Sequence, residues 1–514
     1  MKNIISLKPI LKIAGIITVA AVIGLTMAAC VDPLESDLSG TITISPTDNV
    51  SIGMILTATY SGSEAVSYQW KKDGSNVGAL STTKPNKFTP MEVGNYTVTV
   101  SESGKKSKTS AAINVTFAYT SAAELREWLD SQPVNMHSSL YNVKLNVTSL
   151  GGSSATEGSV GNALSYSEQK LINLDLSGSS FTSVEDNAFT DCGSIAGITL
   201  PNTVTGIGEG AFYGCSSLLS ITIPNSVTDI GDSAFRTCGY LESVTLGNKV
   251  ERIGGTAFGY CNRIESINIP NSVTTINEFA FFECLSLASI TIGNGVTEID
   301  DRAFIGCNNL TEINVAKTAV LKILLPALPD SDIAKPFTVK LNVGNLGGRS
   351  DDKGSVGDAF SVNTDKYVNL DLSGSTFTSI DAEAFFGCYS LTGVIIPNSV
   401  KIIKESAFKS CTSLADIIIP NGVTGIESEA FYGCSGLTSI IIPASVTSLG
   451  ANAFYDCTNL KSVTFLGTIH KESFAADVHP VFNGDLCDVF YGTGDSGTPG
   501  TYTTTDGETW TKQS

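Results

Sequence analysis

The 514-residue sequence predicts a mostly β solenoid with two tandem arrays of 23-residue units, preceded by an all-β sandwich. Three observations predict this fold class. An Ala-Phe pair with Cys three residues after the Phe returns every 23 residues, a longer segment returns after 196 residues, and residues 40–117 contain short alternating strands. A fixed short period indicates a stacked solenoid, in which each unit buries its apolar face only against its neighbours.

Residues 1–29 have the pattern of a secretory signal peptide: a basic start, an apolar run, and small residues before Cys30 in "LTMAAC". This last segment resembles the lipobox of bacterial lipoproteins. The resemblance implies cleavage before Cys30 and a lipid anchor on its thiol. An ordinary secretory signal followed by a chance cysteine is the alternative. Residues 30–39 are then expected to form a short polar tether.

The charge of the chain excludes two classes of partner. There are 50 acidic residues against 31 basic ones, and the formal net charge is −19. Such a chain lacks the basic footprint that binds nucleic acid or an anionic membrane surface. No segment after the leader is long and apolar enough to predict a membrane span. The lipid anchor is therefore the expected membrane attachment.

Residues 40–117 predict a sandwich of two antiparallel sheets. "MILTATY", "VSYQWKKDG" and "GNYTVTVS" alternate apolar and polar residues, and "KKDGS" is a turn signal. "YQW" and "GNYTVTV" resemble a bacterial immunoglobulin-like domain, which implies that Trp70 lies in the core and Tyr96 near a corner. The segment contains no cysteine, so the disulfide that often joins two such sheets is missing.

Each repeat unit supplies one large residue to the core. Ile221 and Ile223 alternate with polar residues and predict a short strand, which Pro224 ends because proline cannot donate to a β-ladder. An Ala-Phe-x-x-Cys segment then closes the coil. The core phenylalanines of the two arrays are Phe189, Phe212, Phe235, Phe258, Phe281 and Phe304, then Phe385, Phe408, Phe431 and Phe454.

The repeats resemble a known family. "IPNSVTDIGDSAFRTC" at 223–238 and "IPNSVTTINEFAFFEC" at 269–284 are similar to the BspA-like, Treponema-type leucine-rich repeats. The resemblance implies two leucine-rich-repeat arrays in a bacterial surface lipoprotein. It also implies adhesion to host proteins or to other cells.

Ten cysteines keep step with the phenylalanines, from Cys192 to Cys307 and from Cys388 to Cys457. We favour a column of buried free thiols, because free cysteine behaves as a small hydrophobic residue and stacked side chains point the same way. Disulfides are an alternative, since the spacing of successive coils does not forbid them. A metal site is a third reading, although zinc sites need close-spaced pairs that this sequence lacks.

A duplicated module overlies the short repeat. "VKLNV" at 143–147 returns at 339–343, and "NLDLSGS" at 173–179 returns at 369–375, both with an offset of 196 residues. Each copy is predicted to contain a helix, opening strands and a leucine-rich-repeat array. The two copies occupy residues 118–316 and 317–465.

The two predicted helices differ in composition. "SAAELREWLDSQP" has a capping box in Ser121 and Glu124, whereas "TAVLKILLPALP" is more apolar and is expected to stop at Pro326. We expect each helix to cover the open end of an array, which predicts two short solenoids in tandem. An amphipathic helix for a partner is the alternative. Residues 466–514 are predicted to form a C-terminal cap, with "GTPGTYTTTDGETW" as a terminal hairpin.

The sequence shows no convincing set of catalytic residues. "GDSG" at 494–497 spells the nucleophile motif of chymotrypsin-like proteases, but that chemistry needs a histidine base and a buried aspartate on a double barrel. We interpret the tetrapeptide as a chance match. The three histidines are His137, His470 and His479, and the spacing of the last two with Cys487 matches no metal loop. We therefore expect no enzymatic activity, no cofactor and no metal.

Curved repeat proteins usually bind through the exposed face of their strands. The outward positions of the first array are polar: Thr199, Thr222, Thr245, Asn268 and Thr291. The matching positions of the second array are Ile395, Ile418 and Ile441. Contiguous apolar surface marks contact sites, so these eight residues are the candidate partner-binding positions. The alternatives are that isoleucine merely favours strands, or that another module covers these side chains.

These observations predict a lipid-anchored protein of the bacterial cell envelope, exposed at the outer membrane surface. Its repeats are expected to bind a protein or another surface macromolecule, as an adhesin does, and no small-molecule substrate. The alternative is a structural or scaffolding lipoprotein that faces the periplasm and has no external ligand.

Overall fold

The computed structural model describes residues 36–38, 40–45, 56–62, 66–83, 86–88, 94–103, 105–115, 117–135, 140–165, 170–361, 365–473 and 480–514. The chain divides into two compact units, Met1–Ala118 and Tyr119–Ser514, and each is described by itself. The leader with Cys30 lies outside the described residues, as do His137 and His479.

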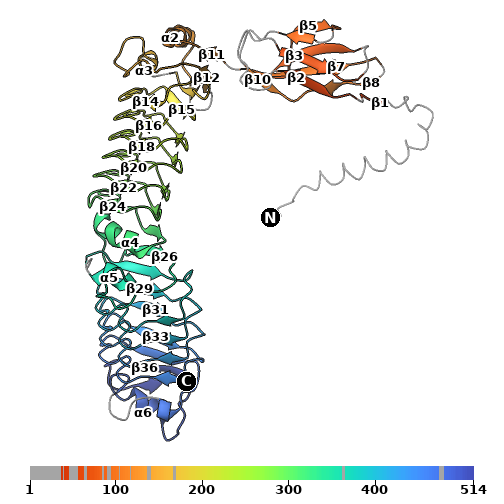
Figure 1. Ribbon diagram of the computed structural model, residues 1–514. Helices are drawn as coiled ribbons and strands as arrows, with labels where there is room; N and C mark the ends of the chain where they lie inside the picture. Colours follow the sequence, from red (N-terminus) through yellow and green to blue (C-terminus); the bar gives the residue numbers. More distant parts are fainter. Residues whose placement is uncertain are drawn as a thin grey trace, which may run out of the picture. The chain divides into compact units, whose positions relative to one another are not determined.

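The N-terminal unit consists of short, mainly antiparallel strands (Figure 1). One sheet has the order β10-β7-β4-β5, with β9 also paired to β7, and a second has the order β2-β3-β6. A third pair, β1 and β8, is parallel. The strands are β1 (Ser36–Asp37), β2 (Ile42–Ser45), β3 (Leu56–Tyr60), β4 (Ser67–Lys72), β5 (Ser75–Ser81), β6 (Asn86–Phe88), β7 (Gly94–Ser101), β8 (Lys105–Lys106), β9 (Lys108–Thr109) and β10 (Ile113–Val115).

A single apolar cluster fills this unit. Trp70, the aromatic residue expected in the core, is buried in it, and Tyr96, which was expected near a corner, is buried there too. The Trp70 ring stacks on Phe88 at a centroid distance of 5.3 Å, and its Nε1 donates a 2.6 Å hydrogen bond to Oδ1 of Asn86. The buried indole therefore has the partner that its polar atom requires.

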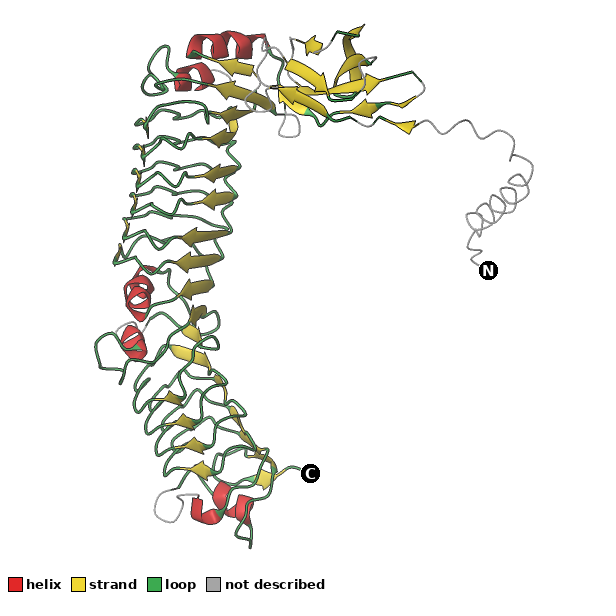
Figure 2. Cartoon of the chain, turned by 45° about the vertical axis from the view of Figure 1, so that its right-hand side comes forward, coloured by secondary structure: helices red, strands yellow, loops and turns green. Residues whose placement is uncertain are grey.

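The C-terminal unit is a solenoid whose longer strands line one side, which is concave in Figure 2. These strands form three successive, mainly parallel sheets. They are β11 (Phe117–Tyr119), β12 (Tyr141–Leu145), β13 (Ile172–Asp175), β15 (Ile195–Thr199), β17 (Ser220–Thr222) and β19 (Ser243–Thr245); β21 (Ser266–Ile269), β23 (Ser289–Ile292), β25 (Glu312–Val315), β26 (Phe337–Leu341), β27 (Val368–Asp371), β29 (Leu391–Ile395) and β31 (Asp416–Ile418); and β33 (Ser439–Ile442), β35 (Ser462–Phe465), β36 (Gly500–Thr503) and β37 (Thr511–Lys512).

Two-residue strands form two further parallel ladders, on another side of the coils. The first ladder is β14 (Ser183–Val184), β16 (Gly206–Ile207), β18 (Asp229–Ile230), β20 (Arg252–Ile253), β22 (Thr275–Ile276) and β24 (Glu298–Ile299). The second is β28 (Ser379–Ile380), β30 (Ile402–Ile403), β32 (Gly425–Ile426) and β34 (Ser448–Leu449). Successive coils within each array therefore hydrogen-bond to one another on two sides, as a stacked solenoid requires.

The expectation of two separate short solenoids is wrong. The seven-stranded sheet runs from β21 to β31 across the junction of the two arrays, and β25, β26 and β27 pair in parallel without a break. The helix α4 (Thr318–Leu324) and the 3₁₀ turn η1 (Leu325–Ala327) lie between β25 and β26. This segment does not close an end; it forms part of one coil of a continuous ladder.

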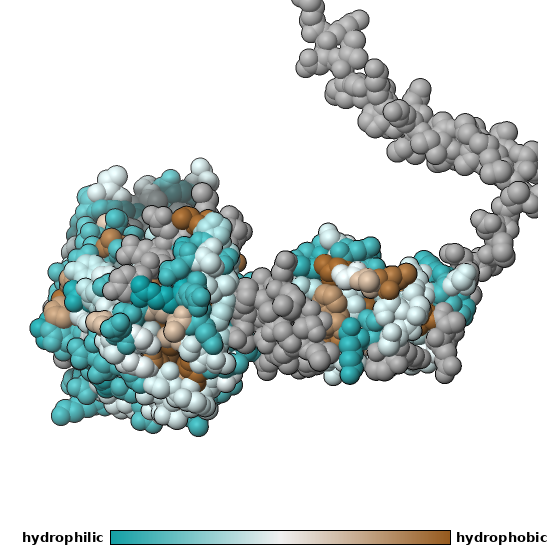
Figure 3. Space-filling model, turned by 90° about the horizontal axis from the view of Figure 1, so that it is seen from above, coloured by the Kyte–Doolittle hydropathy of each residue, from teal (hydrophilic) through white to brown (hydrophobic). Residues whose placement is uncertain are grey.

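The first helix lies where the expectation placed it, at the end of the solenoid (Figure 1). This helix, α2 (Ala122–Ser131), begins after Ser121, whose Oγ accepts a hydrogen bond from the backbone N–H of Glu124. Its Leu125 and Leu129 are fully buried. Figure 3 faces this end of the solenoid and shows mostly hydrophilic residues with small hydrophobic patches. The remaining helical segments are α3 (Val160–Ser165), α5 (Val356–Ser361), η2 (Lys471–Ser473) and α6 (Leu486–Tyr491).

Phenylalanine rings stack along the solenoid axis inside one apolar cluster. The Phe212 and Phe235 centroids are 5.0 Å apart and their planes differ by 5°, and the same geometry recurs within both arrays. The prediction that the phenylalanine of each repeat lies in the core is confirmed. Beyond the last repeat, Phe482 stacks on Phe454 at 5.0 Å, so the C-terminal segment adds one more layer to the column.

The C-terminal tail closes the ladder by changing strand direction. β36 pairs antiparallel with β35, and β37 pairs antiparallel with β36, so the tail forms the expected terminal hairpin. β37 is only two residues long, which leaves little free strand edge for another chain.

Candidate functional site

The candidate binding residues lie in one line along the longer strands. We call this line the central column: it contains one outward-facing residue per coil. Pairing registers link Thr222 with Thr245, Thr291 with Asn314, and Ile395 with Ile418. The structure therefore joins two sets of residues that the sequence placed on separate arrays.

At the junction of the two arrays, the sequence analysis missed three residues of the central column. Asn314, Lys340 and Asp371 pair in succession across the junction, and Asp371 then pairs with Ile395. Asn314 is one 23-residue step after Thr291 and could have been found by extending the period. The repeat of Ala-Phe and Cys is interrupted after it, so the 23-residue step does not reach Lys340 and Asp371. The alternation of "FTVKLNV" at 337–343 is the signal that identifies Lys340 as an outward residue.

The column changes character along its length. Thr199, Thr222, Thr245, Asn268 and Thr291 are all exposed, uncharged and polar. Lys340 and Asp371 follow at the junction. The second array then presents the isoleucine segment, which we define as Ile395, Ile418 and Ile441.

The isoleucine segment is exposed as expected. Ile395, Ile418 and Ile441 keep 48%, 65% and 57% of their surface accessible. The neighbouring strand residues Ile417 and Ile440 face inward and are buried, which is the period-2 alternation of a strand with one wet face. None of the three side chains is covered by another part of the described solenoid. They form an apolar stripe in the otherwise polar column.

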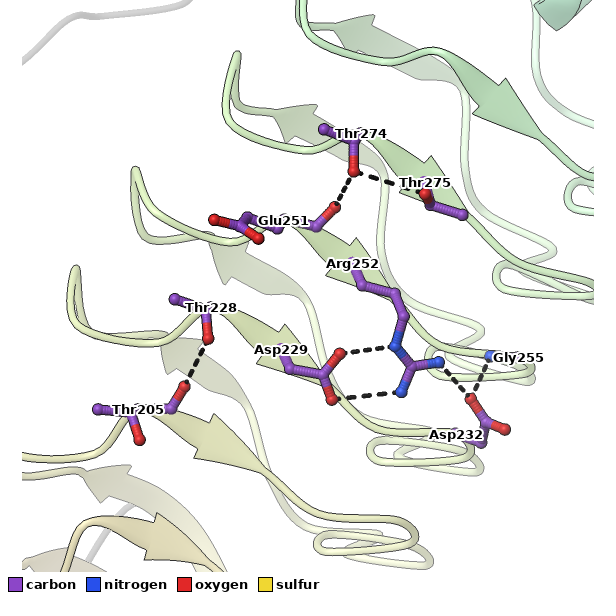
Figure 4. A network of polar contacts seen from close by, with 9 residues as sticks. All are labelled: Thr205, Thr228, Asp229, Asp232, Glu251, Arg252, Gly255, Thr274 and Thr275. Carbon is purple, nitrogen blue, oxygen red and sulfur yellow. Dashed lines mark hydrogen bonds and ion pairs between the residues drawn. The ribbon is translucent and has the colours of Figure 1, made fainter.

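A different side of the coils is held by polar ladders (Figure 4). The hydroxyl of Thr228 donates to the carbonyl oxygen of Thr205 one coil earlier, at 3.2 Å. Arg252 donates through Nε and Nη2 to both carboxylate oxygens of Asp229, at 2.6 and 3.2 Å, and through Nη1 to Asp232 at 3.0 Å. The hydrogen bonds to Asp229 raise the pKa of Arg252 above its usual value. These groups join successive coils by hydrogen bonds and ion pairs.

The family of the chain is shown by its repeats. Residues 158–271, 182–311 and 366–477 match the family described as the BspA type leucine-rich repeat region, in six copies. The matched spans cover just over half of the chain. The protein belongs to the BspA-type leucine-rich repeat family. Repeats of this type are typical of surface or protein-binding proteins.

Several solved structures resemble this BspA-type solenoid. A leucine-rich repeat protein from Bacteroides ovatus is 26% identical, with 71% of this chain and 84% of that chain covered and a TM-score of 0.28. A T. pallidum leucine-rich repeat protein is 30% identical over 34% of this chain and 75% of that chain, with a TM-score of 0.27. A leucine-rich cell surface protein from Faecalibacterium prausnitzii is 22% identical over 75% and 96%, with a TM-score of 0.27. No curated protein matches the sequence.

The cysteines of the BspA-type repeats are buried free thiols, as predicted. Burial raises the pKa of Cys192, Cys238, Cys388 and Cys457 to about 12. A thiol with so high a pKa is not a nucleophile or a ready metal ligand near neutral pH. Across the described ranges, no group of three or more His, Cys, Asp or Glu side chains is placed to hold a metal ion.

One pair of polar residues is brought together that the sequence analysis did not connect. Nδ1 of His470 lies 3.1 Å from Oγ of Ser496, within the "GDSG" segment. Both side chains are exposed, and no described carboxylate bonds to the imidazole. A serine nucleophile needs a base that is itself oriented by a third group, together with donors for the oxyanion. The His470–Ser496 pair supplies only a serine hydroxyl close to an imidazole. The two residues are close because an isolated antiparallel β-bridge joins them.

The helices of the described residues are all too short or too polar to cross a bilayer. The longest of them, α2, has ten residues, whereas a membrane-spanning helix needs about 20.

Proposed function

We propose that the protein is a lipid-anchored adhesin of the bacterial cell envelope, which binds another protein at the cell surface through the isoleucine segment. Cys30 is the proposed anchor, and residues 1–29 are the proposed signal peptide. The N-terminal unit is proposed to be an immunoglobulin-like spacer between the anchor and the repeats, at the outer membrane surface.

The isoleucine segment carries this proposal. Three large apolar side chains at 48%, 65% and 57% exposure stand side by side on a strand face. The same face carries polar residues at the equivalent positions of the first array, so strand propensity alone does not require isoleucine there. Burying such a stripe against a partner removes apolar surface from water, at about 25 cal/mol per Å².

The location is tested first. Intact cells are treated with a protease that does not cross the outer membrane, and the protein is followed by immunoblot. The proposal expects loss of the protein from intact cells. Protection until the outer membrane is opened would instead favour a scaffolding lipoprotein that faces the periplasm. Replacing Cys30 with Ser should release the mature protein from the membrane fraction.

The binding face is tested in the whole protein, because the continuous ladder leaves no natural point at which to separate the arrays. Cells that display Ile418→Asp should adhere less than wild type to neighbouring cells or to a protein-coated surface. Ile402→Asp is the matched control, because Ile402 is also exposed but lies on β30 in the other ladder. Unchanged adhesion by the Ile418 variant would refute the role of the segment. A large fall in thermal stability would show that Ile418 is not a surface residue.

A further inference from the structure

An open groove lies on the first array beside the junction, outside the isoleucine segment. Its volume is about 710 Å³, within the range that binds a small ligand. It lies at the C-terminal ends of β21, β23, β25 and β26. Six asparagines line it: Asn248, Asn268, Asn271, Asn294, Asn314 and Asn342.

The groove is lined by few kinds of polar side chain, and most of them are amides. Side-chain amides both donate and accept hydrogen bonds. Among the lining residues there is no aspartate, glutamate or aromatic residue, and Lys340 is the one charged residue. A planar base therefore finds no ring to stack on, and a metal ion finds no carboxylate. The groove suits a ligand whose groups also donate and accept, and hydroxyl groups do both.

Some polar atoms of this lining have hydrogen-bonding capacity that the described residues do not use. The backbone N–H of Asn294 donates to Oδ1 of Asn271 at 2.8 Å, which fixes that oxygen and leaves the amide NH₂ of Asn271 as a donor. Oδ1 of Asn294 is buried and has no hydrogen-bond partner among the described residues. Buried polar atoms nearly always have a partner, so this amide keeps hydrogen-bonding capacity for a ligand or water once it turns toward the groove. Lys340 is exposed and makes no ion pair with the described residues.

The spacing of the asparagines is regular. Asn248, Asn271 and Asn294 stand at the same turn position of three successive coils, each 23 residues after the last. Neighbouring strands are about 4.8 Å apart, which is close to the length of one pyranose unit. A linear chain of sugar rings laid along the solenoid axis would meet a new set of amides at each ring.

We propose that this groove binds a linear oligosaccharide, with the asparagine amides bonded to the sugar hydroxyls. Lys340, at one end of the groove, would bind a sugar carboxylate where the chain is a uronate. The site is independent of the isoleucine segment, which lies on the second array. Loss of one function would therefore leave the other.

The test uses the full-length protein in detergent and isothermal titration calorimetry with three probes. Mannotetraose is the neutral sugar, tetragalacturonate is the acidic one, and tetraethylene glycol is a linear control without ring hydroxyls. We expect at least one tetrasaccharide to bind and the glycol not to bind. Failure of both tetrasaccharides to bind at 10 mM would overturn the proposal.

Variants locate the site. Asn268→Ala combined with Asn294→Ala should weaken the binding at least tenfold. The control is Asn398→Ala combined with Asn421→Ala, since these asparagines occupy the turn position equivalent to that of Asn294 on the second array and do not line the groove. The control should bind as wild type does. Equal binding by the groove variant, with both proteins unfolding at the wild-type temperature, would contradict the proposal.

Lys340→Met separates the two kinds of sugar. If the ligand is a uronate, this variant should bind tetragalacturonate at least fivefold more weakly and mannotetraose unchanged. If the ligand is neutral, mannotetraose should bind wild type at least as tightly as the uronate, and Lys340→Met should alter neither. Either pattern supports an oligosaccharide site and assigns its charge.

Discussion

The Sγ atom of Cys238 donates a hydrogen bond to the carbonyl oxygen of Phe212, 3.1 Å away and one coil earlier. The same oxygen also accepts the backbone N–H of Cys215 at 3.2 Å. The thiol therefore bonds to an oxygen that already has one partner. The contact repeats along both arrays, for example from Cys261 to Phe235 and from Cys434 to Phe408.

Cys238→Ala should destabilise the solenoid by about 1–2 kcal/mol, because it removes one hydrogen bond and leaves a small buried cavity. Urea unfolding followed by circular dichroism measures the loss. Cys487→Ala, at a half-buried position outside the column, is the control and should cost less. A neutral effect at Cys238 would show that the core closes around the missing sulfur.

The thiols should be unreactive in the native protein. Ellman's reagent is expected to leave the ten repeat cysteines unmodified, because all are buried. In denaturant without reductant, the twelve cysteines less the lipidated Cys30 should give eleven free thiols. A count of two or fewer would mean that the cysteines form disulfides.

Stability should fall at alkaline pH. Burial raises the pKa of Cys238 from 9.0 in its reference state to about 12. The folded protein therefore holds this proton where the unfolded chain has lost it, so the stabilisation is complete below pH 9 and decreases from there toward pH 12. Urea midpoints at pH 8, 9.5 and 10.5 measure the decline. Cys238→Ala removes one such group and should decline less steeply; an identical slope would contradict this linkage.

Thr237→Gly should stabilise the protein. Thr237 has a φ of 61°, a left-handed conformation that is costly for a β-branched residue, and Gly214 occupies the equivalent position one coil earlier at 71°. Glycine removes this strain but adds chain entropy and loses the 2.7 Å hydrogen bond from Oγ1 of Thr237 to the carbonyl oxygen of Arg236, so we expect a net gain of at most about 0.5 kcal/mol. Thr228→Gly, in the ladder of Figure 4 and without a positive φ, should instead lose about 1 kcal/mol. Thermal unfolding of the two variants checks the difference in sign.

The His470–Ser496 pair should be catalytically silent. A fluorophosphonate probe is expected not to label Ser496, because the exposed histidine has no carboxylate partner among the described residues. Ester hydrolysis by the protein should be the same for wild type and Ser496→Ala. Labelling of Ser496 that disappears in His470→Ala would show that the pair is an active nucleophile and base.

The local pattern was sufficient to predict much of the solenoid. The step between Phe212 and Phe235 implies one coil per unit, and alternation around Ile418 places this side chain outside. These features depend on neighbouring residues and on the stacking of identical units. Such stacking is visible in the sequence as a fixed repeat period. The burial of Trp70 in the N-terminal unit was instead implied by the resemblance of its segment to an immunoglobulin-like domain.

Other features depend on contacts between distant residues. The 23-residue period stops between Phe304 and Phe385, and sequence alone indicated a helix there and a new array after it. Only the tertiary structure shows that β25 bonds to β26 across that helix, which turns two columns into one. The asparagine groove and the contact between His470 and Ser496 also depend on residues that are distant in sequence, so only the tertiary structure shows them.

The sequence by itself determined the coil, its phenylalanine and thiol interior and its exposed isoleucines, because each coil repeats the same short-range pattern of burial. The tertiary structure alone decided that the ladder runs across the junction of the two arrays and which polar side chains meet, because hydrogen bonds between strands separated by a helical insertion leave no period in the chain.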